Sequence, residues 1–175
     1  ISYMNKSDLE KQQTDIRKKA KLHGIKMNKD SNLFSVDYNW VVNNSINDIR
    51  AIANTIRSTA RRSGYRSRRD IVGAFASFSQ ELKYQLPPEY RVNEEGEKIL
   101  TSGVTMPLET LRNQYGDCDT KSLLFASLVR SIKLVDVIFV GVKDHLFAAI
   151  RMNPLIDDDS IRYQGRDWVL IELSD

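Results

Sequence analysis

The sequence predicts an α+β fold in which helices come first and the strands of an antiparallel sheet come last. Three observations indicate this fold class. Apolar residues recur at helical spacing in successive segments up to Ile132. β-branched residues dominate the segments after Lys133, as is typical of strands. A chain of 175 residues with 41% hydrophobic residues is long enough for one domain with a sizeable core, and two full domains are not expected.

The first expected helix runs from Ser7 to Leu22. Ser7 is a suitable N-cap with Glu10 three residues later, and Gly24 supplies a stop signal. Few positions in this segment are apolar, so the helix has little surface to bury against a core. We therefore expect a weakly anchored surface helix.

Two stronger apolar stripes predict the next two helices. Ser45 and Asp48 resemble a capping box at the start of the second helix, which Gly64 ends. Ser67 and Asp70 repeat this signature, and a Pro-Pro pair stops the third helix. The two stripes consist of Ile49, Ile52, Ala53, Ile56 and Ala60, and of Ile71, Ala74, Phe75, Phe78 and Leu82. Each helix should therefore pack one face against the core.

The next segments lead to the only cysteine of the chain. Residues 86–107 combine prolines, two glycines and several charges without a sustained period, which predicts a long loop. A short helix from Leu108 to Gln114 follows and is closed by Gly116. The helix that begins near Cys118 is apolar on most sides up to Ile132, which implies burial on several faces. We expect it to be the central helix.

Strands are expected after residue 133. They cover residues 135–142, 146–150, 161–163 and 168–173, and the Gln164-Gly165 pair predicts the turn between the last two. If the strands at 146–150 and 168–173 pair antiparallel, the start of one lies beside the end of the other. This pairing would bring Glu172 close to His145.

Cys118, His145 and Glu172 are the candidate catalytic residues. At the first turn of a helix, the macrodipole and unpaired N–H groups should lower the pKa of the Cys118 thiol and could hold an oxyanion. A nucleophilic thiol needs a base within hydrogen-bond reach, and His145 is the better placed of the two histidines. Glu172 would fix the tautomer of this base.

The residues around Cys118 resemble those of the bacterial and archaeal transglutaminase-like superfamily. The matching strings are Pro107-Leu108-Glu109-Thr110-Leu111 and Tyr115-Gly116-Asp117-Cys118-Asp119-Thr120-Lys121-Ser122, with Arg130 closing the helix. Family members also have a histidine that opens a strand and an acidic residue shortly after an aromatic one on the next strand. Those places match His145 and Glu172 here. The resemblance covers approximately residues 71–174.

The chain departs from the family pattern at two places. Many relatives have an acidic residue two places after the cysteine, where this chain has Thr120 and carries Asp119 one place earlier. The third catalytic residue is more often aspartate. Asp144 is an alternative to Glu172, although neighbouring strand residues point to opposite faces. We prefer Glu172, whose longer side chain can still accept a hydrogen bond from an imidazole N–H.

The resemblance implies a papain-like core at residues 71–175, with the central helix packed on an antiparallel sheet, preceded by a helical region at residues 1–70. It also implies acyl transfer from amides, in which a thioester is hydrolysed by water or captured by an amine. Our first expectation is hydrolysis of a peptide or other amide bond without a cofactor. Transglutaminase activity and a non-catalytic binding module are the alternatives. An oxyanion hole would use the Cys118 N–H and a second donor, for which Gln114 is a candidate.

A basic cluster around Tyr65 is a second candidate site. Its members are Arg61, Arg62, Arg66, Arg68 and Arg69. They could bind phosphate, an anionic envelope polymer or an acidic protein, but a solvated junction between two helices is the simpler interpretation. The three aspartates at 157–159 lack the spacing of an EF-hand loop and predict a polar turn. Trp40 and Trp168 are expected to pack in the core or line a cleft.

Composition sets further bounds. A net charge of +3, from 26 basic and 23 acidic residues, does not favour nucleic-acid binding. One cysteine excludes an internal disulfide, and the chain has too few well-placed Cys and His residues for zinc. The longest apolar segment, 134–142, is too short to span a membrane. A protein or peptide substrate is the expected partner. The oligomeric state stays open. The localisation stays open between cell envelope, periplasm and cytoplasm, because a targeting segment before Ile1 could have been removed.

Overall fold

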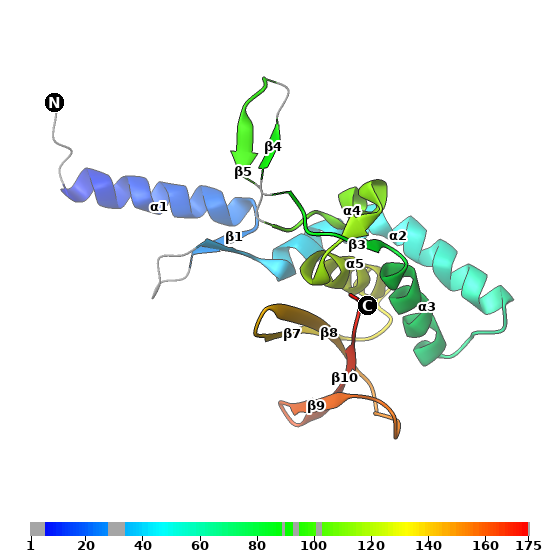
Figure 1. The fold of residues 1–175 in the computed structure, drawn as a ribbon. Coiled ribbons are helices and arrows are strands. Elements are labelled where there is room, and N and C mark those ends of the chain that lie inside the picture. The colour runs from blue at the N-terminus through cyan, green and yellow to red at the C-terminus, as the bar shows by residue number, and fades with distance from the viewer. Residues whose placement is uncertain (1–5, 28–33, 89, 93–94, 101–102, 175) are drawn as a thin grey trace. The chain divides into compact units, whose positions relative to one another are not determined.

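The computed structural model describes residues 6–27, 34–88, 90–92, 95–100 and 103–174 (Figure 1). The chain divides into two compact units, Ile1–Val41 and Val42–Asp175. The α+β class is confirmed, because helices dominate the chain up to residue 131 and an antiparallel sheet follows. None of the described helices is long and apolar enough to cross a membrane.

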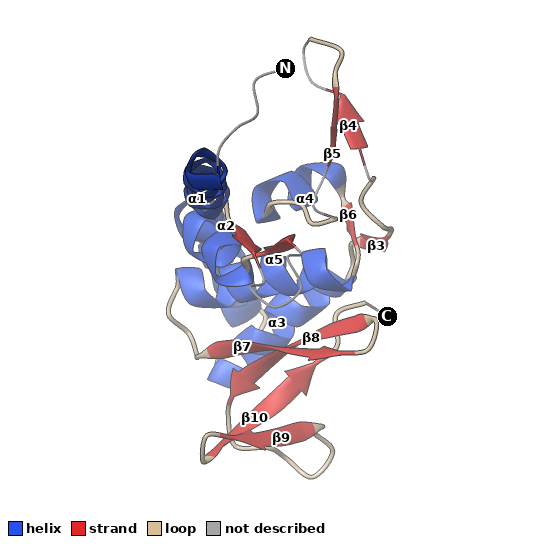
Figure 2. Cartoon of the chain, turned by 90° about the vertical axis from the view of Figure 1, so that its left-hand side faces the viewer, coloured by secondary structure: helices blue, strands red, loops and turns tan. Residues whose placement is uncertain are grey.

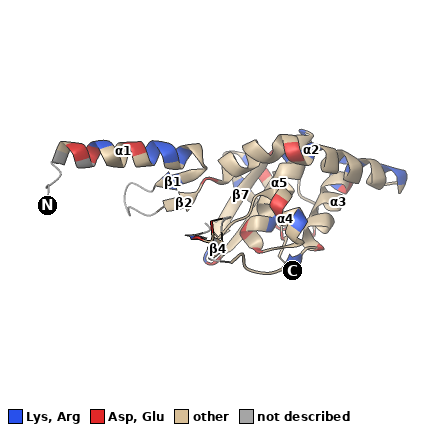
Figure 3. Cartoon of the chain, turned by 90° about the horizontal axis from the view of Figure 1, so that it is seen from above, with Lys and Arg blue, Asp and Glu red and all other residues tan. Residues whose placement is uncertain are grey.

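The first unit contains a charged helix and a two-stranded hairpin. α1 (Lys6–Leu22) confirms the expected surface helix, with an acidic residue in its first turn and basic residues in its last turn (Figure 3). This distribution complements the helix dipole. β1 (Ile25–Met27) pairs antiparallel with β2 (Phe34–Val36). The sequence predicted a helical region at residues 1–70, and these two strands depart from that prediction.

α2 (Tyr38–Arg62) begins well before the start expected at Ser45. Asp37 caps it instead: its Oδ1 accepts from the Trp40 N–H at 3.2 Å, and its carbonyl accepts from the Val41 N–H at 3.0 Å. Ser45 is buried inside the helix, so the predicted capping box at this position is wrong. The segment between Asp37 and Ser45 holds no Gly or Pro, so nothing stops the helix from starting at the earlier cap.

α3 (Arg68–Gln80) begins with the capping box that its sequence predicts. The Ser67 hydroxyl accepts from the Asp70 N–H at 3.1 Å, and Asp70 Oδ2 accepts from the Ser67 N–H at 2.8 Å. Hydrogen bonds from Ser67 hold the pKa of the Asp70 carboxyl below its ordinary value. The start of α3 is therefore fixed by local contacts alone.

The segment between α3 and the cysteine is more ordered than expected. β4 (Tyr90–Val92) and β5 (Lys98–Leu100) form an antiparallel hairpin inside residues 86–107, where a loop was predicted. The prediction is wrong because a three-residue strand is too short to show a period in the sequence. β3 (Lys83–Tyr84) pairs in parallel with β6 (Tyr115–Gly116), which leads directly into the candidate site.

α4 (Pro107–Asn113) is the expected short helix, but Gly116 does not close it. Gln114 ends it in the left-handed conformation, with φ of 61°, and donates its N–H to the Thr110 carbonyl at 2.9 Å. Gly116 instead lies in β6, where its role is steric. The turn was therefore placed two residues too late in the sequence-based prediction.

α5 (Cys118–Ser131) is the central helix of the second unit, as predicted. Eleven of its residues are buried, on nearly all sides of the helix. The four-stranded sheet consists of β7 (Val137–Val142), β8 (His145–Arg151), β9 (Ser160–Tyr163) and β10 (Arg166–Ile171), in the order β7-β8-β10-β9, and every pairing is antiparallel. Figure 2 shows the helices of this unit gathered on one face of the sheet.

The hydrophobic core lies between α2, α3, α5 and the inner face of the sheet. Its buried residues are Ile49, Ala53, Ala60, Ile71, Val72, Phe75, Leu124, Phe125, Leu128, Val129, Ala148, Ile150, Val169 and Leu173. Because α2 contributes three of them, the unit that holds Cys118 extends to the N-terminal side of residue 71, where the sequence suggested a boundary. Trp168 is 6% exposed and packs at the sheet, as expected.

Candidate functional site

Cys118 occupies the first residue of α5, as the sequence predicts. Asp117 caps the helix, since its Oδ1 accepts from the Thr120 N–H at 2.9 Å and its carbonyl accepts from the Lys121 N–H at 2.9 Å. The backbone N–H of a first helical residue has no acceptor within its own helix. Cys118 is partly exposed as a residue.

Gly116 has a steric reason to precede this helix start. A Cβ atom on Gly116 would lie 2.8 Å from Thr120 Cγ2 and 3.0 Å from Thr120 Cβ, closer than ordinary van der Waals contact. Thr120 is fully buried, and its Oγ1 has no hydrogen-bond partner among the described residues. Thr120 is therefore a packing residue in this chain.

The environment of the Cys118 thiol contradicts the expectation of a lowered pKa. Burial raises the pKa of the thiol above its ordinary value, and the Asp119 and Asp117 carboxylates raise it further, while a hydrogen bond from the Leu146 amide lowers it. Cys118 Sγ also donates to Asp119 Oδ1 at 3.5 Å. The helix dipole favours a thiolate, but burial and two nearby negative charges outweigh it. At neutral pH the proton resides on sulfur.

The predicted pairing of β8 with β10 is confirmed and brings His145 to Glu172. Arg151 lies opposite Trp168, and Ala148 lies opposite Ile171, so the first residue of β8 meets the residues that follow β10. His145 Nε2 lies 2.8 Å from Glu172 Oε2. This contact joins two side chains that are 27 residues apart in the chain. The side chains are 25% and 31% exposed, so the pair is partly exposed rather than buried in the core.

Glu172 is held by hydrogen-bond donors on its other oxygen. Its Oε1 accepts from the backbone N–H groups of Leu173 and Ser174, each at 2.8 Å, and from the Ser174 hydroxyl. Burial alone would raise the pKa of Glu172, but the Ser174 contacts, the His145 ring and the Leu173 amide together lower it. An ionised carboxylate only accepts hydrogen bonds, so His145 Nε2 carries the hydrogen in this pair.

Contacts at the start of β8 connect the imidazole to the helix that carries the cysteine. The rings of His145 and Phe147 meet edge to face, with centroids 4.4 Å apart and planes at 83°, which restrains the imidazole. Ser122 Oγ donates to the Leu146 carbonyl at 3.3 Å, and the Leu146 amide faces the Cys118 thiol. The thiol therefore lies beside the residue that follows His145.

A second set of contacts fixes the backbone at Glu172. Gln80, the last residue of α3, donates its side-chain Nε2 hydrogen to the Glu172 carbonyl at 2.8 Å. Lys121 is fully buried, and its Nζ donates to the Gln80 carbonyl at 3.1 Å. These bonds connect α3, α5 and the segment after β10 around the candidate site. Gln80 and Lys121 carried no signal in the sequence, because their partners are 92 and 41 residues away.

Tyr84 is a further residue at this site that sequence reasoning missed. Partial burial raises the pKa of its phenol above the ordinary value. Cys118, in the thiolate form that it takes at high pH, and the Asp117 carboxylate raise it further, with smaller contributions from Asp119 and Glu172. The parallel pairing of β3 with β6 places Tyr84 opposite Gly116. This two-residue pairing is too short to be predicted from a pattern, although it brings Tyr84 near enough to Cys118 for the two groups to interact electrostatically.

Two further sequence candidates near the site have other positions. The Gln114 side chain is exposed at the end of α4, and the described contacts assign a structural role only to its backbone. Asp144 is exposed in the turn before β8, with φ of 58°, and the carboxylate that contacts the imidazole belongs to Glu172. Between the two acidic alternatives for the third residue, the geometry favours Glu172.

The arginine cluster divides into one structural residue and four exposed ones. Arg69 Nη1 lies 2.7 Å from Asp158 Oδ2, and its Nη2 donates to the Asn153 carbonyl at 2.7 Å. Asp158 also accepts from the Leu155 N–H at 2.7 Å, and this bond and the Arg69 guanidinium hold its pKa below the ordinary value. Arg61, Arg62, Arg66 and Arg68 are exposed at the junction of α2 and α3. The polar turn at residues 157–159 is thus clamped to α3.

Among the described residues, no group of three or more His, Cys, Asp or Glu side chains is arranged to hold a metal ion. Comparisons of the chain with protein-family models, with curated proteins and with solved structures find no match. The chemistry of the site must therefore be inferred from its own residues.

Proposed function

We propose that this chain is a cysteine-dependent acyl-transfer hydrolase that cleaves a peptide or other amide bond through a thioester, on a papain-like, transglutaminase-like core. The observation that supports the proposal most strongly is the 2.8 Å contact of His145 with Glu172, two residues far apart in sequence. This pair forms at the start of β8, next to the helix residue that carries the thiol. A nucleophile, a base and an orienting carboxylate are the groups that acyl transfer needs.

The proposed mechanism assigns each nitrogen of His145 one role. Nε2 donates its hydrogen to Glu172, so Nδ1 carries the free lone pair of the neutral ring. Nδ1 takes the proton of Cys118 while the sulfur attacks the carbonyl carbon of the substrate amide. The C–N bond then breaks, and the leaving amine receives that proton. Water next gives a proton to Nδ1 and attacks the thioester, and the sulfur leaves and regains its proton.

The raised pKa of the Cys118 thiol determines the order of events in this proposal. Since the proton resides on sulfur, a preformed thiolate–imidazolium pair is not the resting state. The imidazole therefore acts as a general base during the attack, and the ionised Glu172 stabilises the imidazolium that forms. The Cys118 N–H is one oxyanion donor, with Gln114 or the Tyr84 hydroxyl as the second.

The test is cleavage of a peptide library with and without an added primary amine, with the products identified by mass. We expect cleavage products that disappear, by about 10³-fold or more, in Cys118→Ala and in His145→Ala. His23→Ala is the matched control, because this second histidine is exposed in the first unit and should leave activity unchanged. Cleavage that survives Cys118→Ala, or cleavage of no amide at all, would overturn the proposal.

One observation favours a second candidate, a non-catalytic binding module. A thiol with a raised pKa is a weaker nucleophile at neutral pH than an activated one, as in a protein that keeps the fold but has lost turnover. The library experiment separates the two functions, because a binding module yields neither cleaved nor amine-modified peptides. Products that incorporate the amine would instead identify a transglutaminase.

A further inference from the structure

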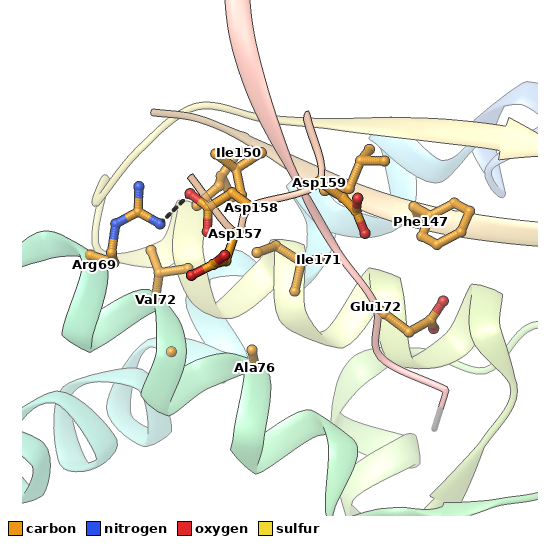
Figure 4. A pocket seen from close by; sticks show the side chains of 13 residues that line it. Arg69, Val72, Ala76, Phe147, Ile150, Asp157, Asp158, Asp159, Ile171 and Glu172 are labelled. Atoms are coloured by element: carbon orange, nitrogen blue, oxygen red, sulfur yellow. Dashed lines mark hydrogen bonds and ion pairs between the residues drawn. The ribbon is translucent and has the colours of Figure 1, made fainter. Parts of the chain in front are cut away.

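A cavity of about 410 Å³ opens between α3 and the sheet, adjacent to the candidate site. Glu172 and Phe147, the two side chains that contact the His145 ring, both line it. Figure 4 shows Val72 and Ala76 of α3 on one side, and the residues of the strands and of the 157–159 turn on the other. The cavity therefore adjoins the His145–Glu172 pair through Glu172 and Phe147.

Acidic side chains outnumber basic side chains in the lining of this cavity. Arg69 is its only basic lining residue, and its guanidinium is paired with Asp158 at 2.7 Å. Asp157 and Asp159 also line the cavity and are exposed, and neither makes an ion pair among the described residues. After the Arg69–Asp158 pair is set aside, the carboxylates of Asp157, Asp159 and Glu172 remain. Glu172 is already held by donors from His145, Leu173 and Ser174, which leaves Asp157 and Asp159 available to a ligand.

The rest of the lining is apolar. Val72, Gly73, Ala76, Ile150, Val169 and Ile171 supply this surface. A long side chain with an aliphatic stem and a charged end matches such a surface, because the stem can pack on the apolar wall while the charge stays in water. A short acidic side chain would instead meet two like charges.

We propose that this cavity binds a lysine or arginine side chain of the peptide substrate, next to the bond that Cys118 cleaves. The aliphatic stem packs between α3 and the strands, and the cationic end lies at Asp157 and Asp159. The inference rests on the proposed function of the cysteine site, and it names the substrate class that this site accepts.

The first experiment compares the cleavage of peptides that differ only in one residue near the scissile bond, with Lys, norleucine or Glu at that place. The structure predicts the order Lys, then norleucine, then Glu in kcat/KM. In the double variant D157N/D159N, kcat/KM for the Lys peptide should fall roughly three- to tenfold, as for one or two partly exposed ion pairs. The norleucine peptide should be cleaved as before.

The control variant is D15N/D48N, which changes the net charge equally at two exposed aspartates on α1 and α2. It should leave the preference for Lys unchanged. A loss of preference in this control as well would show that overall charge, and not the cavity, selects the substrate. That result would overturn the inference.

A binding measurement makes the inference testable apart from turnover. With Cys118→Ala, fluorescently labelled Lys and norleucine peptides are titrated at low and high salt. Tighter binding of the Lys peptide, reduced by salt and lost in D157N/D159N, supports the cavity even if no peptide is ever cleaved; the proposed function alone would then fail. Cysteine-dependent cleavage without any preference for Lys would refute the inference alone. Equal binding of both peptides with no cleavage would refute both.

Discussion

The surroundings of Cys118 and those of Glu172 differ in the kind of neighbour that each acid meets. Cys118 at the start of α5 is partly buried and lies near carboxylates, with Asp119 Oδ1 at 3.5 Å, and its pKa is raised even though the Leu146 amide donates to the sulfur. Glu172 after β10 is surrounded by donors from Leu173, Ser174 and the imidazole, and its pKa is lowered. The pKa values of the two acids are therefore shifted in opposite directions, that of Cys118 upwards and that of Glu172 downwards.

This contrast teaches how charge is distributed before any reaction. Glu172 is ionised and the Cys118 thiol keeps its proton, while the Asp119 and Asp117 carboxylates add negative charge near the sulfur. In the proposed mechanism, the imidazole that contacts Glu172 is the group that takes the thiol proton. Pairs of groups whose environments push their pKa values apart are typical of acid–base sites. Each of the following substitutions removes either the carboxylate of Glu172 or a group that shifts the pKa of Cys118 or Glu172.

The largest effect is expected from Glu172→Gln. The amide oxygen would still accept from the Leu173 and Ser174 N–H groups, so its NH₂ would face His145 Nε2 and force the hydrogen onto Nδ1. The ring could then no longer take the thiol proton. We expect kcat/KM to fall by about 10²- to 10⁴-fold, measured on a peptide that the unchanged chain cleaves.

Glu109→Gln provides the matched control for this variant, since Glu109 is exposed on α4. It should retain full activity. If Glu172→Gln retained activity as well, Glu172 would have no role in orienting His145, and the contrast between the two acids would be without functional meaning.

An intermediate effect, in the opposite direction, is expected from Asp119→Asn. Removing this carboxylate takes away one of the groups that raise the pKa of the thiol, so more thiolate is present at pH 7. Alkylation of Cys118 by iodoacetamide should accelerate roughly two- to tenfold. In the unchanged chain, the alkylation rate should continue to rise at pH values where a free thiol has reached its plateau. Asp48→Asn is the control and should be alkylated at the rate of the unchanged chain. If Asp119→Asn were also alkylated at that rate, Asp119 would not act on the sulfur.

The smallest effect is expected from Ser174→Ala, which removes one of three donors from Glu172 Oε1. The pKa of Glu172 should then move up towards its ordinary value near 4.5. A lowered carboxyl pKa contributes stability above that ordinary value, and the contribution is lost as pH falls through the pKa of the folded state. At pH 7 the variant should lose about 1 kcal/mol or less of unfolding free energy.

Chemical denaturation between pH 7 and pH 3 checks this prediction. The difference between Ser174→Ala and the unchanged chain should shrink as pH falls, whereas Ser63→Ala, at an exposed serine, should show no difference at either end. A difference that stays constant with pH would mean that the Ser174 hydroxyl supports the fold without acting on the carboxylate.

The sequence was sufficient to predict the parts of the site that follow from regular elements. The start of α5 at Cys118 followed from a turn and an apolar run, and the approach of His145 to Glu172 followed from the antiparallel pairing of two strands. The direction of the thiol pKa was not predicted correctly, because the helix dipole can be read from position along the chain but burial cannot.

Contacts between distant segments account for what the sequence did not reveal. Arg69 was grouped with its neighbours in sequence, yet its partner Asp158 is 89 residues away and removes it from that group. Tyr84 reaches the site through a pairing of two residues. α2 starts at Tyr38 because Asp37, a second suitable cap, lies upstream of Ser45. For Arg69 and Tyr84, tertiary contacts selected one of several equally good local interpretations, whereas for α2 the choice lay between two local caps.

The close approach of Gly116 to Thr120 has a consequence for the position of the sulfur. Any methyl group at residue 116 must push the first turn of α5 outward, because the atoms it meets belong to a fully buried residue that has no room to retreat. Cys118 lies within that turn and would be carried along with it. A hydrogen atom in place of a side chain thus permits the observed position of the sulfur, although Gly116 itself has no functional group.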